Sequence, residues 1–204
     1  MNGETLLLRH GDRTVTTLDL DRWVRPADDA DRHALLSVVA PALDVGCGPG
    51  RIVEALQLRG IRALGIDIAG TAVTLARARG ANARRYDVFG RVPAAGTWQT
   101  VLLLDGNIGI GGDPAALLTR ALQLLAPSGI VLVEAHEEPG MYLRSPARFV
   151  RAGQTVGPTF PWALVGRHAL ERIATTLGYR IEAAWTSQRR AFMALRAPAG
   201  DPLS

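Results

Sequence analysis

The sequence predicts an α/β fold, in which a mostly parallel sheet carries helices on both faces. From Pro41 onward, short apolar runs alternate with stretches of helical periodicity, which is typical of parallel α/β sheets. A glycine-rich turn follows the first run, and an acidic residue ends the second. At 204 residues the chain can bury a substantial core, so we expect residues 1–204 to form a single domain.

The central part of the chain, residues 41–135, carries most of this pattern. Asp113 can cap a helix there, Pro114 suits its first position, and the segment Pro127-Ser128-Gly129 ends it. Strands are expected near residues 42–45, 61–66, 82–86, 100–104 and 129–135, with helices near residues 50–59, 70–79 and 114–125.

Both ends of the chain are expected to add smaller elements. In the N-terminal extension, residues 1–40, a His10-Gly11-Asp12 turn predicts a hairpin, and a helix should run from Asp28 or Asp31 to Val39. Residues 136–164 are rich in Gly and Pro and are expected to form an irregular loop region. The C-terminal part, residues 165–204, is expected to hold a helix over 165–177 and strands over 179–186 and 190–196.

Composition excludes several kinds of protein. The chain has no run of about 18 apolar residues, so no membrane-spanning helix is expected. No basic segment precedes an apolar stretch at the N-terminus, which argues against a signal peptide. A single cysteine rules out a disulfide within the chain and a cysteine-rich metal site. Together these features favour a cytoplasmic protein.

The charge gives little support for a nucleic-acid partner. The formal net charge is +4, and all 23 basic residues are arginine. These arginines are scattered, without interleaved aromatic residues. The spacing of His10, His33 and His168 fits no metal site, so we expect no metal and assign these histidines no role. Monomer and homodimer both remain open.

The most informative motif is the segment Asp44-Val45-Gly46-Cys47-Gly48-Pro49-Gly50-Arg51. Glycine permits positive φ in a tight turn, and its missing Cβ lets a ligand lie against the backbone. The helix that follows offers unpaired N–H groups at its N-terminus. Asp67 ends the second apolar run, where an acid typically binds a ribose hydroxyl pair. The motif therefore predicts a nucleotide-containing cofactor: NAD, FAD or S-adenosylmethionine.

The spacing of the glycines separates these cofactors. Dinucleotide folds carry G-x-G-x-x-G, whereas here the glycines follow G-x-G-x-G. Asp44 would repel a pyrophosphate but suits a ligand with a sulfonium and an ammonium group. The segment D-V-G-C-G-P-G-R resembles motif I of the class I S-adenosylmethionine-dependent methyltransferases. This resemblance covers residues 41–135 well and 165–196 more loosely. It implies a seven-stranded Rossmann-like sheet whose last strand is antiparallel.

The resemblance also implies roles for particular residues. Asp67 would bind the ribose hydroxyls and Ile68 the adenine face, while Asp87 and Val88 would contact the adenine amino group and ring. The stretch D-G-N-I-G-I-G-G-D-P, residues 105–114, resembles small actinobacterial-type methyltransferases and would border the transferring methyl group. The implied cofactor residues are Asp44, Gly46, Cys47, Gly48, Gly50, Asp67, Ile68, Asp87, Val88, Asp105, Gly106 and Asn107.

The chemistry of methyl transfer points to further candidates. Transfer from a sulfonium is an in-line displacement, and a hydroxyl or protonated amine acceptor additionally needs a base. His136, at the end of the fifth strand, is the candidate base, although a solvated histidine in an acidic turn is the plainer alternative. Four residues are candidates to line an acceptor pocket, and covering the core is their alternative role: Tyr142, Arg144, Phe160 and Trp162.

The expected function is S-adenosylmethionine-dependent methyl transfer to a small molecule, for example in secondary metabolism. The chain lacks the N/D-P-P-Y/F tetrad of amino-methylating DNA enzymes, which argues against a DNA acceptor. Two alternatives remain: a non-methylating S-adenosylmethionine-binding protein of the same fold, and a NAD(P)-binding oxidoreductase. The latter is disfavoured by Asp44, by the glycine spacing and by the absence of lysine for a Tyr-x-x-x-Lys dyad. The N-terminal extension either covers the cofactor or patches a sheet edge.

Overall fold

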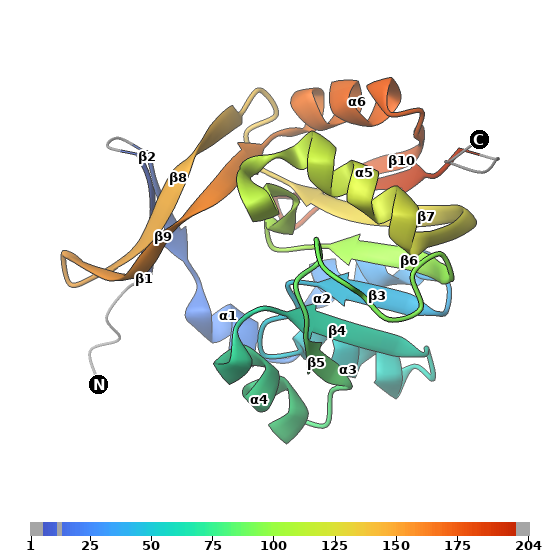
Figure 1. Cartoon of the computed structure of the whole chain (residues 1–204), viewed down its shortest axis with the longest axis horizontal. Helices are drawn as coiled ribbons and strands as arrows, with labels where there is room; N and C mark the ends of the chain where they lie inside the picture. Colours follow the sequence, from blue (N-terminus) through green and yellow to red (C-terminus); the bar gives the residue numbers. More distant parts are fainter. Residues whose placement is uncertain (1–5, 12–13, 199–204) are drawn as a thin grey trace.

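The computed structural model describes residues 6–11 and 14–198. Its main sheet has seven strands in the order β10-β11-β7-β6-β3-β4-β5 (Figure 1). Neighbours from β5 to β7 pair in parallel, whereas β11 is antiparallel to both β7 and β10. This confirms the mostly parallel sheet with an antiparallel last strand. The strands are β3 (Ala42–Val45), β4 (Ala63–Asp67), β5 (Ala83–Arg85), β6 (Trp98–Leu103), β7 (Leu125–Ala135), β10 (Arg180–Ser187) and β11 (Arg190–Arg196).

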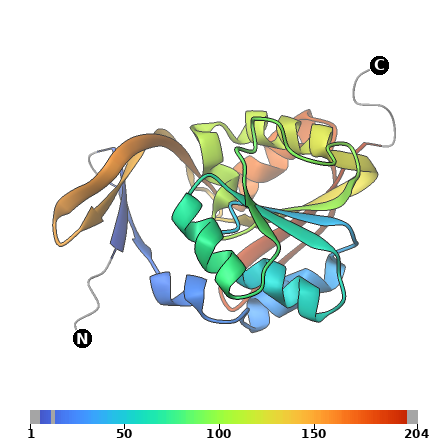
Figure 2. The same ribbon diagram turned by 60° about the horizontal axis from the view of Figure 1, so that its bottom comes forward.

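Helices cover both faces of this sheet, as the sequence predicts (Figure 2). Side chains alternate between two core layers along β6, where Val101 and Leu103 join one layer and Leu102 the other. Residues of α5 and α6 complete the first layer, and residues of α2, α3 and α4 complete the second. The bounds of these helices are α2 (Asp29–Ala34), α3 (Arg51–Leu58), α4 (Gly70–Ala78), α5 (Pro114–Leu124) and α6 (Arg167–Thr176).

The region expected to be an irregular loop forms two long strands instead, which corrects that expectation. These strands, β8 (Tyr142–Arg151) and β9 (Gln154–Val165), are joined by a turn in which Ala152 and Gly153 both have positive φ, as type I′ hairpins require. The prolines in both strands hide the alternating pattern, and β9 tolerates them because it is an edge strand. Since β9 continues to Val165, α6 begins two residues later than expected.

The N-terminal hairpin, β1 (Leu6–His10) and β2 (Thr14–Leu18), joins these strands in a second, antiparallel sheet of order β2-β1-β8-β9. Figure 1 shows this sheet projecting from the side of the molecule where β6 ends. Between β6 and α5 the chain forms a 3-10 turn, η2 (Asn107–Gly112). A Cβ at Gly109 would overlap the carbonyl oxygen of Ala163, so η2 packs directly on β9.

Two short helices connect the sheets. The first, α1 (Leu20–Val24), was not expected from the sequence. The second, α2, begins after Asp28, which forms a capping box with Asp31, and it gives way to a 3-10 turn over Leu35–Ser37. The helix is therefore shorter than the predicted one, because Val38 is already extended and Val39 donates its N–H to Oγ1 of Thr100. Within residues 6–11 and 14–198, no helix is long and apolar enough to span a membrane.

Candidate functional site

The glycine turn lies between β3 and α3, and its three glycines serve different purposes. A Cβ at Gly46 would lie 2.7 Å from Nδ2 of Asn107, and a Cβ at Gly50 would lie 2.8 Å from the Cβ atoms of Ala76 and Ala81. These two glycines are therefore required by packing. At Gly48, by contrast, φ is +52° and no atom lies within 4 Å of the Cβ position. Gly48 is the glycine that leaves room for a ligand.

Asp67, at the end of β4, is held against this turn. One carboxylate oxygen accepts from the N–H of Gly48 at 3.0 Å and the other from the N–H of Ala69 at 2.8 Å. Both oxygens keep a second lone pair, which a vicinal diol can use. The neighbouring Ile68 is 66% exposed, as a residue that covers an adenine face must be.

Asp44 lies beneath the turn, where more acidic than basic groups surround it. Its side chain is 2% exposed, and Oδ2 has no hydrogen-bond partner among the described residues. Burial raises the pKa of Asp44 to about 7, the charge of Asp105 adds to the increase, and Arg51 opposes it. A buried carboxyl group without a partner costs stability. This arrangement favours a cationic group of a ligand beside Asp44.

The other predicted cofactor residues differ in how much of their side chains a ligand could contact. Asp87 is exposed and accepts from the N–H of Phe89 at 2.9 Å, while Val88 is 4% exposed and packs in the core, so only its backbone can face a ligand. Nδ2 of Asn107 donates to the carbonyls of Val45 and Gly46 and fastens η2 to the glycine turn. Cys47 is buried, and burial raises the pKa of its thiol, so it packs as a neutral side chain.

An arginine–carboxylate cluster, which was not predicted from the sequence, lies beside Asp44. Arg51 reaches Asp31 and donates to both oxygens of Asp105 at 2.7 and 2.6 Å. Asp105, preceding Gly106, also pairs with Arg22 at 2.9 Å. Sequence patterns carry no signal for contacts between residues so far apart in the chain. The cluster consists of Arg22, Arg51 and Arg190 with Asp28, Asp31, Asp105 and Glu134.

Arg190 ties the last strand into this cluster. Its guanidinium makes two contacts with Glu134, at 2.7 and 2.6 Å, and one with Asp31 at 2.7 Å. Burial alone would lower the pKa of Arg190. The hydrogen bond and charge of Glu134, together with Asp31, outweigh burial and raise this pKa above its usual value. The cluster holds four carboxylates and three guanidinium groups, so it carries an excess of negative charge near the glycine turn.

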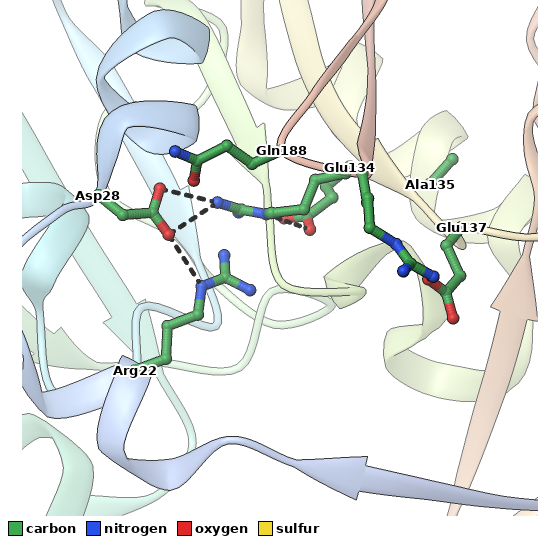
Figure 3. Close-up of a pocket in the computed structure, with 8 residues that line it drawn as sticks. Arg22, Asp28, Glu134, Ala135, Glu137 and Gln188 are labelled. Carbon is green, nitrogen blue, oxygen red and sulfur yellow. Dashed lines mark hydrogen bonds and ion pairs between the residues drawn. The ribbon is translucent and has the colours of Figure 1, made fainter.

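A charged hollow of about 400 Å³ opens beside the cluster (Figure 3). It lies where β7 ends, against the turn between β10 and β11. In Figure 3, Arg22 and Asp28 point toward each other across it. Glu137 and Arg189 add a more loosely paired ion pair at 3.7 Å. The lining residues are Arg22, Asp28, Glu134, Ala135, Glu137, Gln188, Arg189 and Arg190.

His136, the candidate base, follows β7. Its backbone N–H donates to the carbonyl of Val165 at 2.8 Å, and its ring Nδ1 accepts from the backbone N–H of Glu138 at 3.1 Å. In the neutral ring the proton then belongs on Nε2. The geometry therefore presents His136 as a hydrogen-bond donor through Nε2, and a role as base requires the contact with Glu138 to open.

The structure does not bring the four candidate acceptor residues together. Cross-strand partners point to the same side of a sheet, and Phe160 and Trp162 share one side of β9. Tyr142 and Arg144 occupy the opposite phase of β8. Arg144 donates to Gly112 and pairs with Asp113, each at 2.8 Å, and so ties β8 to the start of α5. His10, which we assigned no role from the sequence, is 2% exposed on β1.

The sheet order, the glycine turn after its first strand and the acid after its second define the class I methyltransferase fold. Residues 20–184 match the methyltransferase domain family, and the chain belongs to this family. A trans-aconitate 2-methyltransferase from Paracidovorax citrulli (strain AAC00-1) is 30% identical over 118 residues, which cover 56% of this chain and 45% of that enzyme. The match thus spans about half the length of that relative.

Solved structures share the fold. A S-adenosylmethionine-dependent methyltransferase from Bacteroides fragilis, in complex with S-adenosylhomocysteine, superposes with a TM-score of 0.79 at 23% identity, over 96% of this chain and 88% of that one. The 1,6-didemethyltoxoflavin-N1-methyltransferase of Burkholderia thailandensis, with bound 1,6-didemethyltoxoflavin and S-adenosylhomocysteine, gives a TM-score of 0.59 at 18% identity, over 85% and 77% of the chains.

Proposed function

We propose that this protein transfers the methyl group of S-adenosylmethionine to a small-molecule acceptor. The observation that carries the proposal is Asp44, a buried carboxyl group whose Oδ2 has no partner among the described residues. S-adenosylmethionine carries two cationic groups, the sulfonium and the ammonium, and either of them would offset the surplus of acidic groups around Asp44. A pyrophosphate in the same place would be repelled by Asp44.

The residues present fit this cofactor. Gly48 leaves room beside the turn, Asp67 offers carboxylate lone pairs to the ribose hydroxyls, and Ile68 exposes an apolar surface for adenine. Asp87 would contact the adenine amino group from its exposed position. When bound, the cofactor supplies an activated methyl group on a sulfonium. The residues of this chain would hold the methyl group at the carboxyl edge of the sheet and align the acceptor with it.

A small-molecule acceptor is favoured by two relatives. The P. citrulli and B. thailandensis enzymes are named for trans-aconitate and 1,6-didemethyltoxoflavin as their acceptors, and both are small molecules. The acceptor would meet the methyl group at the carboxyl edge of the sheet, where the proposed cofactor binds.

Mass spectrometry with methyl-labelled S-adenosylmethionine tests this function. The full chain is incubated with a panel of carboxylic acids, phenols and amino sugars, and transfer of the label to one class is the expected result. Production of S-adenosylhomocysteine in step with the labelled product excludes slow decomposition of the cofactor. Binding of S-adenosylmethionine without label transfer to any acceptor class would instead support the non-methylating alternative.

A further inference from the structure

One side of the second sheet gathers aromatic rings and polar groups. His10 pairs with Ala147 across β1 and β8, and Ala147 pairs with Phe160 on β9. Directly opposed residues point to the same side of a sheet. The aromatic contacts agree with this arrangement. The ring centroid of Phe160 lies 5.1 Å from that of Phe149 and 6.0 Å from that of Trp162, which it meets edge to face. We call this surface the aromatic face; it comprises His10, Ser145, Phe149, Phe160 and Trp162.

The aromatic face adjoins the proposed cofactor site through a single turn. A Cβ at Gly109 in η2 would lie 2.8 Å from Nε1 of Trp162. In the same turn, Asn107 donates to the carbonyls of Val45 and Gly46 at the glycine turn. The aromatic face therefore lies next to the carboxyl end of β6, where an acceptor must meet the methyl group.

Two buried polar atoms on this face lack partners. Nδ1 of His10 and Oγ of Ser145 have no hydrogen bond among the described residues. An unpaired buried polar group costs about 1–3 kcal/mol, so a ligand that offered a hydrogen-bond partner to either atom would recover part of this free energy. The rings of Phe149, Phe160 and Trp162 are only half-buried, which leaves aromatic surface available beside these atoms.

His10 has a ring nitrogen that can accept a proton. Its Nε2 lies 3.3 Å from Oγ1 of Thr16 and can donate to it, which leaves the lone pair on Nδ1. Burial, and then the nearby His136, lower the pKa of His10, so the ring is neutral at neutral pH. In His136 the corresponding Nδ1 is already occupied by the N–H of Glu138.

We propose that the aromatic face is the acceptor subsite, that it takes a planar aromatic molecule bearing a hydroxyl group, and that Nδ1 of His10 accepts the hydroxyl proton. This inference rests on the proposed function. The acceptor's oxygen bonds to the methyl carbon as the carbon–sulfur bond breaks, and the electron pair of that bond stays on sulfur. The O–H proton moves to His10, which later releases it to water. Ser145 donates to the same oxygen, and the rings hold the acceptor plane.

Long-range ¹H–¹⁵N NMR of the full chain, saturated with S-adenosylhomocysteine, tests this assignment. The chain has four histidines, so each imidazole can be assigned. We expect Nδ1 of His10 to carry no proton before a probe is added. Titration with 4-nitrophenol should shift this Nδ1 resonance and the indole N–H of Trp162. No binding of 4-nitrophenol, shifts confined to other residues, or equal affinity for cyclohexanol would overturn the proposal.

Variants separate this inference from a structural role of the same residues. Ser145→Ala and Phe160→Leu should each weaken 4-nitrophenol binding roughly five- to tenfold, the loss expected for one hydrogen bond or one ring contact. His10→Gln should do the same, while the exposed control His168→Gln should not change the affinity. Unchanged 4-nitrophenol affinity in both Ser145→Ala and Phe160→Leu would contradict the proposal. Calorimetry with S-adenosylhomocysteine reports on the proposed function separately: its failure in the unmodified protein contradicts that function, whereas intact binding without 4-nitrophenol binding contradicts only the aromatic face.

Discussion

Asp44 and Asp67 play different parts at the glycine turn. Asp67 is fixed by two backbone N–H groups, whereas Oδ2 of Asp44 is buried without a partner among the described residues. Both acids could be predicted from the sequence, because Asp44 lies two residues before the first glycine of the turn and Asp67 ends the second apolar run. The charges around Asp44 could not be predicted, since Arg51, Asp31 and Asp105 come from separate parts of the chain.

Replacing Asp67 should weaken cofactor binding. Asp67→Ala removes charge-assisted hydrogen bonds to the ribose, and the affinity for S-adenosylhomocysteine should fall by about 1–3 kcal/mol. Isothermal titration calorimetry measures the change. Glu171→Ala, on the exposed side of α6, is the control and should bind as the unmodified protein does. An unchanged affinity in Asp67→Ala would remove Asp67 from the site.

Asp44 should make cofactor binding depend on pH. Its pKa is about 7 in the free protein, and a cation beside it lowers that pKa, so binding near pH 6.5 releases a proton. Affinity for S-adenosylmethionine should therefore rise with pH up to about 7 and then level off. Calorimetry in two buffers of different ionisation enthalpy measures the proton count. Asp44→Asn should abolish the release, and equal release in that variant would assign the proton to another group.

The packing of η2 on β9 explains why the loop after β6 is rich in glycine. Gly109 and Gly112 lie against β9, and Gly111 lies against Phe89. From the resemblance we expected this stretch to border the transferring methyl group. Its packing on β9 could not be foreseen, because prolines and glycines hid β8 and β9 and the pairing of β1 with β8 joins distant parts of the chain.

A pair of glycine variants tests this contact. In Gly109→Ala the new Cβ would overlap the carbonyl oxygen of Ala163, so the free energy of unfolding should fall by about 1–3 kcal/mol. In Gly140→Ala nothing lies within 4 Å of the new Cβ, and the stability should stay within about 0.5 kcal/mol. Urea denaturation compares the two. Equal stability of both variants would mean that η2 and β9 do not pack as described.

The arginine–carboxylate cluster joins the N-terminal extension to the core and to the last strand. It connects Asp28 and Asp31 near α2 with Asp105 after β6 and with Arg190 on β11. Sequence separations as large as 162 residues put such contacts beyond pattern analysis, although the sheet order itself was predictable from the motif and the terminal hairpin. These contacts tie the extension to Asp105, which follows β6 at the carboxyl edge of the sheet.

Adjacent arginines provide a matched test of this cluster. Arg190→Leu leaves the buried Glu134 without its ion-pair partner and removes one of the partners of Asp31, so the protein should lose about 3–5 kcal/mol of stability. Arg189→Leu removes a side chain that is 90% exposed and should change stability by less than about 0.5 kcal/mol. Thermal and chemical unfolding measure both variants. A similar small effect for the two would show that the cluster contributes little to folding.

The most direct test of the account is calorimetric titration of the full chain with S-adenosylmethionine, S-adenosylhomocysteine, NADH and NADPH. Binding of the two adenosyl compounds alone, with stabilisation of the fold by mass action, is the predicted result. Binding of a nicotinamide cofactor in their place would contradict the assignment of the glycine turn, Asp44 and Asp67 to a sulfonium cofactor.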